Sequence, residues 1–225
     1  MRNRAIVIAL LFVSLTSLGQ NPLKAEVAQL PAGVLTGNLY TNNALGLSFC
    51  VPPAWTAKPD PKGPVILDPK PNGRANQCSK ILLTFEAPGK VEGRFSSFGM
   101  VLAIDPRCLS AGPFPQSTDD KDNLNKVVDK IVKYFKNTSF FSPYGVTIYA
   151  LRTQENKGPM LILMKGAMTI NAIEGHPPPR KEPLGVSTLF ALEESRGYWI
   201  AWGYMADDPS RDELEKNSRM LIQGD

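Results

Sequence analysis

Alternating apolar and polar residues predict a short, sharply bounded strand at residues 47–51, with the sequence LSFCV. A period of two residues is typical of a strand that has one buried face. Gly46 provides the turn before this strand, and Pro52 and Pro53 end it because proline has no N–H for a neighbouring strand. We expect the ring of Trp55 to fold back over this end of the sheet and to bury apolar area there.

Six further apolar runs of strand length predict the rest of the sheet. Residues 80–86 and 100–105 flank a segment that contains Pro88, Gly89 and Gly93, which predicts a hairpin. The other predicted strands are residues 146–152, 160–170, 186–193 and 198–205. The last of them carries an aromatic row on one face, and we expect that row to supply core area rather than to line a pocket.

Residues 117–137 form the clearest predicted helix, because apolar residues recur along it at every third or fourth position. Ser117 or Thr118 is the predicted cap, and aspartates follow in the first turn, where the helix dipole favours them. Lysines gather toward the other end. We interpret them as a solvated face, with a docking surface as the alternative.

Strands in two sets around one helix predict a single α/β domain of the α+β type with a mainly antiparallel sheet. We expect the helix of residues 117–137 on one face and a closing helix at the end. That closing helix is predicted from an Asp208 cap, with Pro209 at its first position, to about Met220. The predicted organisation is a signal peptide at 1–25, an N-terminal linker at 26–38 and one domain at 39–225.

The opening of this domain resembles that of PsbP-like domains, in which an aromatic residue, a glycine, a short strand and a P-x-x-W element follow in order. The residues that carry the resemblance are Tyr40, Gly46, Leu47, Ser48, Phe49, Val51, Pro52 and Trp55. Cys50 and the second proline, Pro53, depart from the pattern. The resemblance implies an α/β sandwich that acts as an accessory or binding module. It transfers no functional residue, because the matching positions are structural in kind.

The first 25 residues have the features of an export signal. Arg2 and Arg4 precede nine unbroken apolar residues at 5–13, too few for a membrane span, which needs about 20. Ser17-x-Gly19 and Leu23-x-Ala25 are both tolerable cleavage sites. Cleavage after Ala25 leaves no stable span, and it predicts a periplasmic or secreted protein. It also removes three of the 25 basic residues and none of the 21 acidic ones, so the net charge falls from +4 to +1. Such a balance gives no reason to expect a nucleic-acid partner.

The cysteines predict one disulfide, between Cys78 and Cys108, with Cys50 free. If the hairpin turns near residue 93, Cys78 and Cys108 are equidistant from the turn and therefore face each other. Export places these thiols in an oxidising compartment, which favours the bond.

Two proline-rich stretches are predicted to be exposed. We interpret residues 56–77 as a long ordered loop with a short strand at 65–67; such loops are often functional, although a surface excursion without a ligand is the simpler interpretation. Residues 171–185 connect two strands. Within them, six residues form a possible contact loop in extended conformation, with a stiff hairpin connection as the equal alternative: His176, Pro177, Pro178, Pro179, Arg180 and Lys181.

Candidate chemistry is sparse along the chain. His176 is the one histidine, and a proline-held loop is a poor place to fix an imidazole beside a nucleophile. Asp119, Asp120 and Asp122 lack the spacing of a calcium loop, and one histidine with three scattered cysteines lacks the spacing of a zinc site. No catalytic residue, metal or cofactor is therefore predicted.

The sequence supports two hypotheses of function. The first is an exported, non-catalytic binding or accessory module for an unknown protein or small-molecule partner outside the cytoplasm, which makes contact through its proline-rich loops. The alternative is an extracytoplasmic hydrolase whose site is assembled around His176 or the scattered carboxylates.

Overall fold

The computed structural model describes residues 26–61, 77–89, 96–115, 120–135, 147–152, 160–170 and 184–222, and the structural statements below concern these residues. In chain order the elements are β1 (Val34–Thr36), β2 (Leu39–Asn42), the 3-10 helix η1 (Asn43–Leu45), β3 (Leu47–Cys50), β4 (Thr56–Pro59), β5 (Ser79–Glu86), β6 (Phe98–Ile104), α3 (Lys121–Phe135), β7 (Thr147–Arg152), β8 (Met160–Ile170), β9 (Leu184–Ser195), β10 (Tyr198–Ala206), α4 (Asp208–Asn217) and β11 (Arg219–Ile222). All the predicted strands that fall within the described residues are therefore present.

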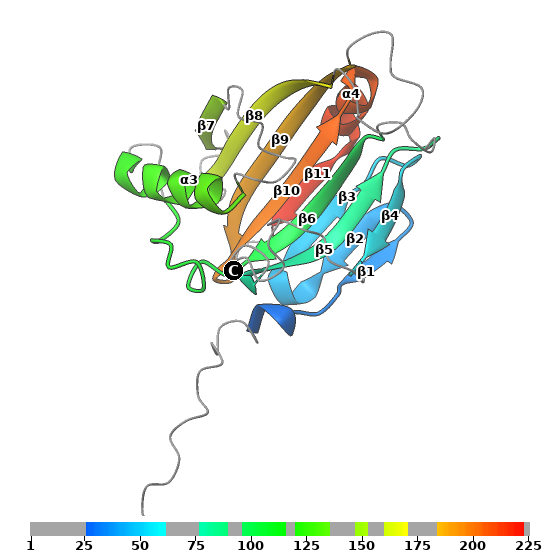
Figure 1. Ribbon diagram of the computed structural model, residues 1–225. Helices are drawn as coiled ribbons and strands as arrows, with labels where there is room; N and C mark the ends of the chain where they lie inside the picture. Colours follow the sequence, from blue (N-terminus) through cyan, green and yellow to red (C-terminus); the bar gives the residue numbers. More distant parts are fainter. Residues whose placement is uncertain are drawn as a thin grey trace, which may run out of the picture.

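The strands form two antiparallel sheets rather than the single sheet that we predicted. The small sheet has the order β1-β2-β3-β11, and the large sheet has the order β4-β5-β6-β10-β9-β8-β7. Figure 1 shows the small sheet along one face of the large sheet, with α3 on the other side. The fold is α+β, as expected from strands that do not alternate strictly with helices.

Two apolar cores lie on the two faces of the large sheet, which is therefore the middle layer. The first core joins α3 to the large sheet through Val127 and Val128, which pack with Trp199 of β10. The second core lies between the sheets and includes Phe49 of β3 and Ile200 of β10. Because Trp199 and Ile200 are consecutive, β10 supplies alternate residues to the two cores, as its sequence pattern predicts.

Trp55 closes one end of the second core, which confirms the prediction made from its sequence position. Its side chain is 6% exposed, and its ring centroid lies 5.9 Å from that of Phe85. The indole N–H donates to Oε2 of Glu213 on α4 at 2.9 Å. The hydrogen bond satisfies the one polar group of a buried ring, so Trp55 ties the β3–β4 connection to α4.

Gly99 of β6 leaves room for the ring of Phe85, its partner across β5 and β6. A Cβ atom at position 99 would meet that ring and would lie 2.9 Å from the carbonyl oxygen of Gly203. We expect Gly99→Ala to lower the free energy of unfolding by about 1 to 3 kcal/mol, because a packed core accepts an extra methyl group only by shifting its neighbours.

Urea unfolding measures this change, and Gly112→Ala is the matched control. The atom nearest to a Cβ at position 112 is Oδ1 of Asn123, 3.9 Å away, which is an ordinary contact. Equal stabilities of the two variants would contradict the packing described for Gly99.

The closing helix differs from the prediction at both ends. Its N-cap is Asp207, whose side chain accepts from the N–H of Ser210 at 3.1 Å, while Asp208 is the first helical residue. Ser97 selects Asp207: its Oγ donates to Asp207 Oδ1 at 3.2 Å and accepts from the Asp207 N–H at 3.1 Å. The helix ends at Asn217, and the chain continues as β11, which pairs with β3.

Two predicted irregular segments contain strands. Residues 56–59, the start of the predicted loop, form β4 at the edge of the large sheet, where the missing N–H of Pro59 is tolerated. The segment 26–38, predicted as a linker, contains β1, which pairs with β2. For α3 the side chain of Asp120 accepts from the N–H of Asn123 at 3.4 Å, whereas residues 117 and 118 lie outside the described residues. The predicted strand at 65–67 also lies outside them.

Candidate functional site

The predicted disulfide joins Cys78 to Cys108, with Cα atoms 5.4 Å apart. The pairing is confirmed, but the register from which we predicted it is wrong. The N–H of Asp105 donates to the Cys78 carbonyl at 2.8 Å, so Asp105 lies opposite Cys78, and a turn after it brings Cys108 back. A bulge between Ile81 and Leu83 also shifts the β5–β6 pairing. The bond indicates an oxidising environment.

A buried carboxylate fixes the turn that carries Cys108. Asp105 is fully buried, and it accepts from the Arg107 backbone N–H at 2.9 Å and from the guanidinium Nε and Nη2 at 3.1 and 3.0 Å. Arg107 also pairs with Glu26, with Nη2 2.9 Å from Oε2. Hydrogen bonds to Asp105 and Glu26 raise the pKa of Arg107 above its usual range. All these charges are used to hold the turn and the start of the described chain.

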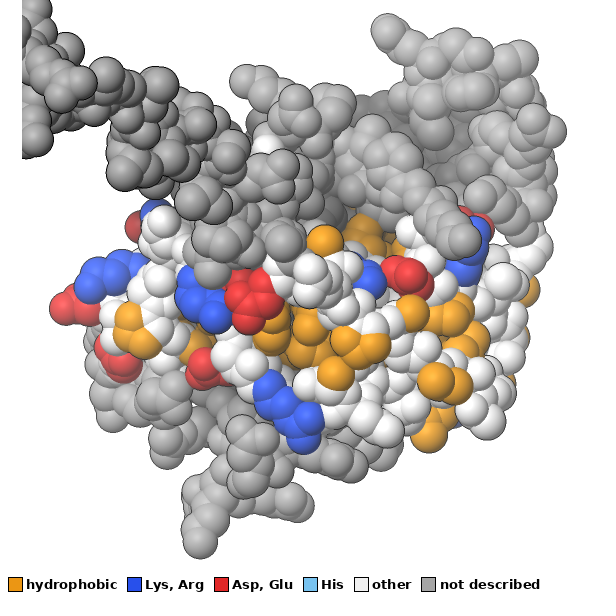
Figure 2. Space-filling view, turned by 90° about the horizontal axis from the view of Figure 1, so that it is seen from below, with side chains coloured by type: hydrophobic (Ala, Val, Ile, Leu, Met, Phe, Trp, Pro, Cys, Tyr) orange, Lys and Arg blue, Asp and Glu red, His pale blue; other side chains and the backbone are white. Residues whose placement is uncertain are grey.

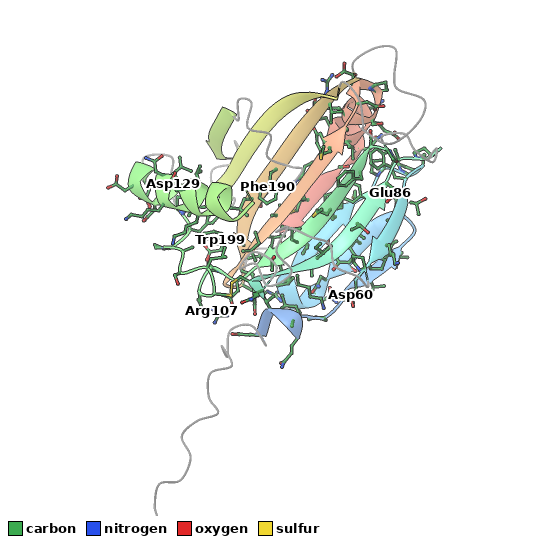
Figure 3. All side chains as sticks on the ribbon, viewed as in Figure 1. Asp60, Glu86, Arg107, Asp129, Phe190 and Trp199 are labelled. Atoms are coloured by element: carbon green, nitrogen blue, oxygen red, sulfur yellow. A yellow bond between two sulfur atoms is a disulfide. The ribbon has the colours of Figure 1, made fainter. Side chains whose placement is uncertain are left out.

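Residues 26–33, which we call the N-terminal strap, lie across the end of the two sheets. Its residue Val27 is 2% exposed, and Leu30 packs against the second core. Figure 2 shows this end of the molecule, where apolar side chains lie between separate groups of both charge signs. In Figure 3, Asp60 and Arg107 lie toward this end and Glu86 lies toward the opposite one.

Three consecutive carbonyl groups of the N-terminal strap each accept one side-chain hydrogen bond. Lys80 Nζ donates to Leu30 O at 2.6 Å, Asn42 Nδ2 donates to Pro31 O at 2.9 Å, and the Tyr40 hydroxyl donates to Ala32 O at 2.8 Å. Burial raises the pKa of Tyr40, which keeps the hydroxyl protonated as a donor. The contacts recognise main chain and are therefore independent of the side chains of the strap.

The outward side of the small sheet, which we call the outward face, carries no charge in β1 to β3. Strand pairing places its residues in two rows: Val34, Thr41 and Ser48 in one, and Thr36, Leu39 and Cys50 in the other. Their neighbours along each strand point to the second core. Among the described residues, the exposed large apolar side chains are Val34, 62% exposed, and Leu39, 40% exposed, and both lie on this face.

Glu193 of β9 is a half-buried carboxylate. It shares a strand face with Ser195, whose Oγ donates to Leu45 O at 2.6 Å, so it lies on the side of the large sheet that faces the small sheet. Burial raises its pKa to about 7. Glu194 is the next residue along the strand and therefore points to the opposite face. The two acids do not form the facing carboxylate pair that glycoside hydrolysis requires.

The structure tests only some of the predicted site residues. The disulfide cysteines are joined, and Cys50 is free. Asp120 accepts from the N–H and the side-chain amide of Asn123 and so has a structural role. The contact loop at 176–181, which includes the histidine of the hydrolase hypothesis, lies outside the described residues, as does Asp119.

The described residues contain neither a cluster of potential metal ligands nor a membrane-spanning helix. No three histidine, cysteine or acidic side chains among them are grouped so as to hold a metal ion. No helix within the described ranges has the length and apolar character needed to cross a bilayer.

Sequence analysis did not predict the N-terminal strap, and it predicted only part of the outward face. The strap is held through backbone carbonyls, which any residue carries. The outward face depends on β1, within the segment that we predicted as a linker. The alternation of Ser48 and Cys50 with buried residues identified part of this face, but not its neighbours.

Comparison with known proteins adds no assignment: no protein-family model and no curated protein sequence matches this chain.

Proposed function

We propose that the chain is an exported, non-catalytic binding or accessory module with a PsbP-like sandwich domain, and that it binds another extracytoplasmic protein through the outward face. The partner in this proposal presents a neutral surface with apolar side chains. The resemblance around residues 40–55 and the layering of helix, large sheet and small sheet support the family. The disulfide supports an extracytoplasmic location.

The observation that carries the proposal is the composition of the outward face. A solvated antiparallel sheet normally presents polar and charged side chains on its outer side. Here the six described outward positions of β1 to β3 hold no charge, and the exposed Val34 and Leu39 lie on neighbouring strands. On the neighbouring strand β11, Arg219 pairs with Cys50 at the edge of this face. Nucleic acid or an anionic membrane would require a cluster of basic side chains, so the six neutral positions of β1 to β3 favour a neutral protein surface.

The alternative hydrolase has weaker support. A half-buried Glu193 with a raised pKa is a feature of some catalytic acids. Its neighbour Glu194 points to the opposite face, and Ser195 uses its hydroxyl to bond Leu45. Neither Glu194 nor Ser195 is therefore placed to act with Glu193 in a catalytic site.

The test introduces two negative charges on the outward face. We expect Val34→Glu combined with Leu39→Glu to reduce capture of a partner from the exported fraction at least about tenfold, because each new carboxylate must be desolvated in the interface. Stability should change little, since both side chains are exposed. The readout is affinity capture followed by mass spectrometry.

Lys126→Glu is the matched control, because Lys126 is exposed on α3, on the other side of the large sheet. A protein counts as a partner only if the native chain and the Lys126→Glu variant capture it and the double variant does not. Equal capture by all three chains would reject the outward face as the binding surface. Loss in the α3 variant alone would transfer the function to the helix.

A further inference from the structure

The N-terminal strap is bound in the manner of a peptide ligand. The carbonyl groups of residues 30–32 accept hydrogen bonds from Lys80, Asn42 and Tyr40. These donors belong to β5 and β2 and not to the strap. Within the described residues, its own backbone hydrogen bonds are internal, from Gln29 N to Glu26 O and from Leu30 N to Val27 O. Main-chain recognition by fixed donors gives affinity without fixing sequence.

The donors are preorganised by bonds that do not involve the strap. Asn42 is 1% exposed, and its Oδ1 accepts from the N–H of Leu45 at 3.3 Å. Lys80 Nζ lies 3.4 Å from Asp60 Oδ1, and the Tyr40 hydroxyl accepts from Asn42 Nδ2 at 3.3 Å. We therefore expect these three donors to keep their positions when the strap leaves.

The ends of the strap set the side-chain requirements of this groove. Val27 is buried, and Glu26 pairs with Arg107. Gly33, with φ of +75°, lies against the Tyr40 ring, where an added Cβ would also be 2.7 Å from Thr41 O. The groove therefore fits a segment that begins with one helical turn, with an acidic residue, then an apolar one, and a glycine six positions after that.

We propose that the N-terminal strap occupies this groove in cis and that a segment of a partner protein, of the same pattern and conformation, displaces it. Removal of the predicted signal after Ala25 makes the strap the first segment of the mature chain. Strand pairing begins only at Val34, so the strap can leave without breaking either sheet. The groove lies at the end of the sandwich and is distinct from the outward face, so this inference does not rest on the proposed function.

A labelled peptide with the strap sequence EVAQLPAG tests the proposal by fluorescence anisotropy against the mature chain purified after export. In the native chain the tethered strap competes at an effective concentration of about 1 mM, so the peptide should bind weakly. Val27→Asp makes docking of the tethered strap unfavourable but leaves the three donors in place. We expect this variant to bind the peptide at least about tenfold more tightly than the native chain does.

Two controls separate displacement from instability. Gln29→Asp changes an exposed position of the same strap and should behave like the native chain. A peptide that carries aspartate at the position of Val27 should not bind either chain. Hydrogen exchange follows release of the tethered strap in the Val27→Asp chain.

Three results would overturn the proposal. The first is a released strap without capture of the peptide, and the second is a Val27→Asp chain that unfolds, because the strap would then be part of the fold. The third is an undisturbed strap in the Val27→Asp chain, because the segment would then not be displaceable.

Discussion

Replacing Cys78 and Cys108 together by alanine should lower the free energy of unfolding by about 3 to 4 kcal/mol, the largest effect that we expect from any change described here. The bond joins residues 30 positions apart, and closing a loop of this length removes about that much chain entropy from the unfolded state. Both cysteines are buried in the first core, at 0% and 3% exposed. The bond also fixes the turn that begins with Asp105.

Guanidinium denaturation under non-reducing conditions measures this effect. Cys50→Ala is the control, since Cys50 is the free cysteine and lies on the outward face. We expect it to change stability by less than about 0.5 kcal/mol. A double variant that loses less than about 1 kcal/mol would show that the bond is not a main support of the fold.

Glu193→Gln should stabilise the folded protein relative to the native chain at high pH. This stabilisation should be about 2 to 3 kcal/mol larger at pH 8 than at pH 5. Burial raises the pKa of Glu193 to about 7 in the folded chain, from 4.5 when solvated. Between pH 4.5 and about pH 7, Glu193 is therefore protonated in the folded state and ionised in the unfolded state. Native stability falls as pH rises through this window and then levels off, because each pKa unit corresponds to about 1.4 kcal/mol.

Urea unfolding at a series of pH values gives this profile. The stabilising difference of Glu193→Gln should be near zero below pH 4.5 and reach its full size above about pH 7. Asp129→Asn, which removes an exposed carboxylate of α3, controls for the loss of one negative charge. A constant difference between native and Glu193→Gln chains across the range would contradict the buried, ionisable state of Glu193.

Local pattern was sufficient for most of the fold. The period of two residues located the strands, because each strand buries one or both faces and the sequence records which. The same alternation divided β10 between the two cores, with Trp199 on one side and Ile200 on the other. Trp55 was placed correctly because the two prolines before it end the strand beside the core in which its ring is buried.

Errors arose where tertiary contacts decide. The run of residues 219–222 is too short to identify itself, and only pairing with β3 makes it a strand. Asp207 and Asp208 are equivalent caps in sequence, and Ser97, 110 positions away, decides between them. The disulfide prediction succeeded although its register was wrong, because the turn after Asp105 returns Cys108 to the vicinity that we had assigned to a straight strand.

The candidate binding surfaces were beyond sequence analysis for a related reason. The six neutral positions of the outward face come from β1, β2 and β3, and β1 contains only three residues. No single segment of the sequence therefore shows that these positions form a neutral surface. Residues 30–32 of the N-terminal strap are recognised through their carbonyl groups, so the sequence of this part carries no record of the contact. Such sites depend on which segments meet, and that is set by the whole fold.

The most direct test of the proposed binding function is site-specific photo-crosslinking from the outward face. A photoreactive residue in place of Thr41, which lies between Val34 and Ser48 in one row of this face, is compared with one in place of Asp129 on α3. The account predicts that the probe at Thr41 forms a covalent adduct with one defined extracytoplasmic protein and that the probe at Asp129 does not. Adducts of that protein with Asp129 alone, or none with Thr41, would contradict it.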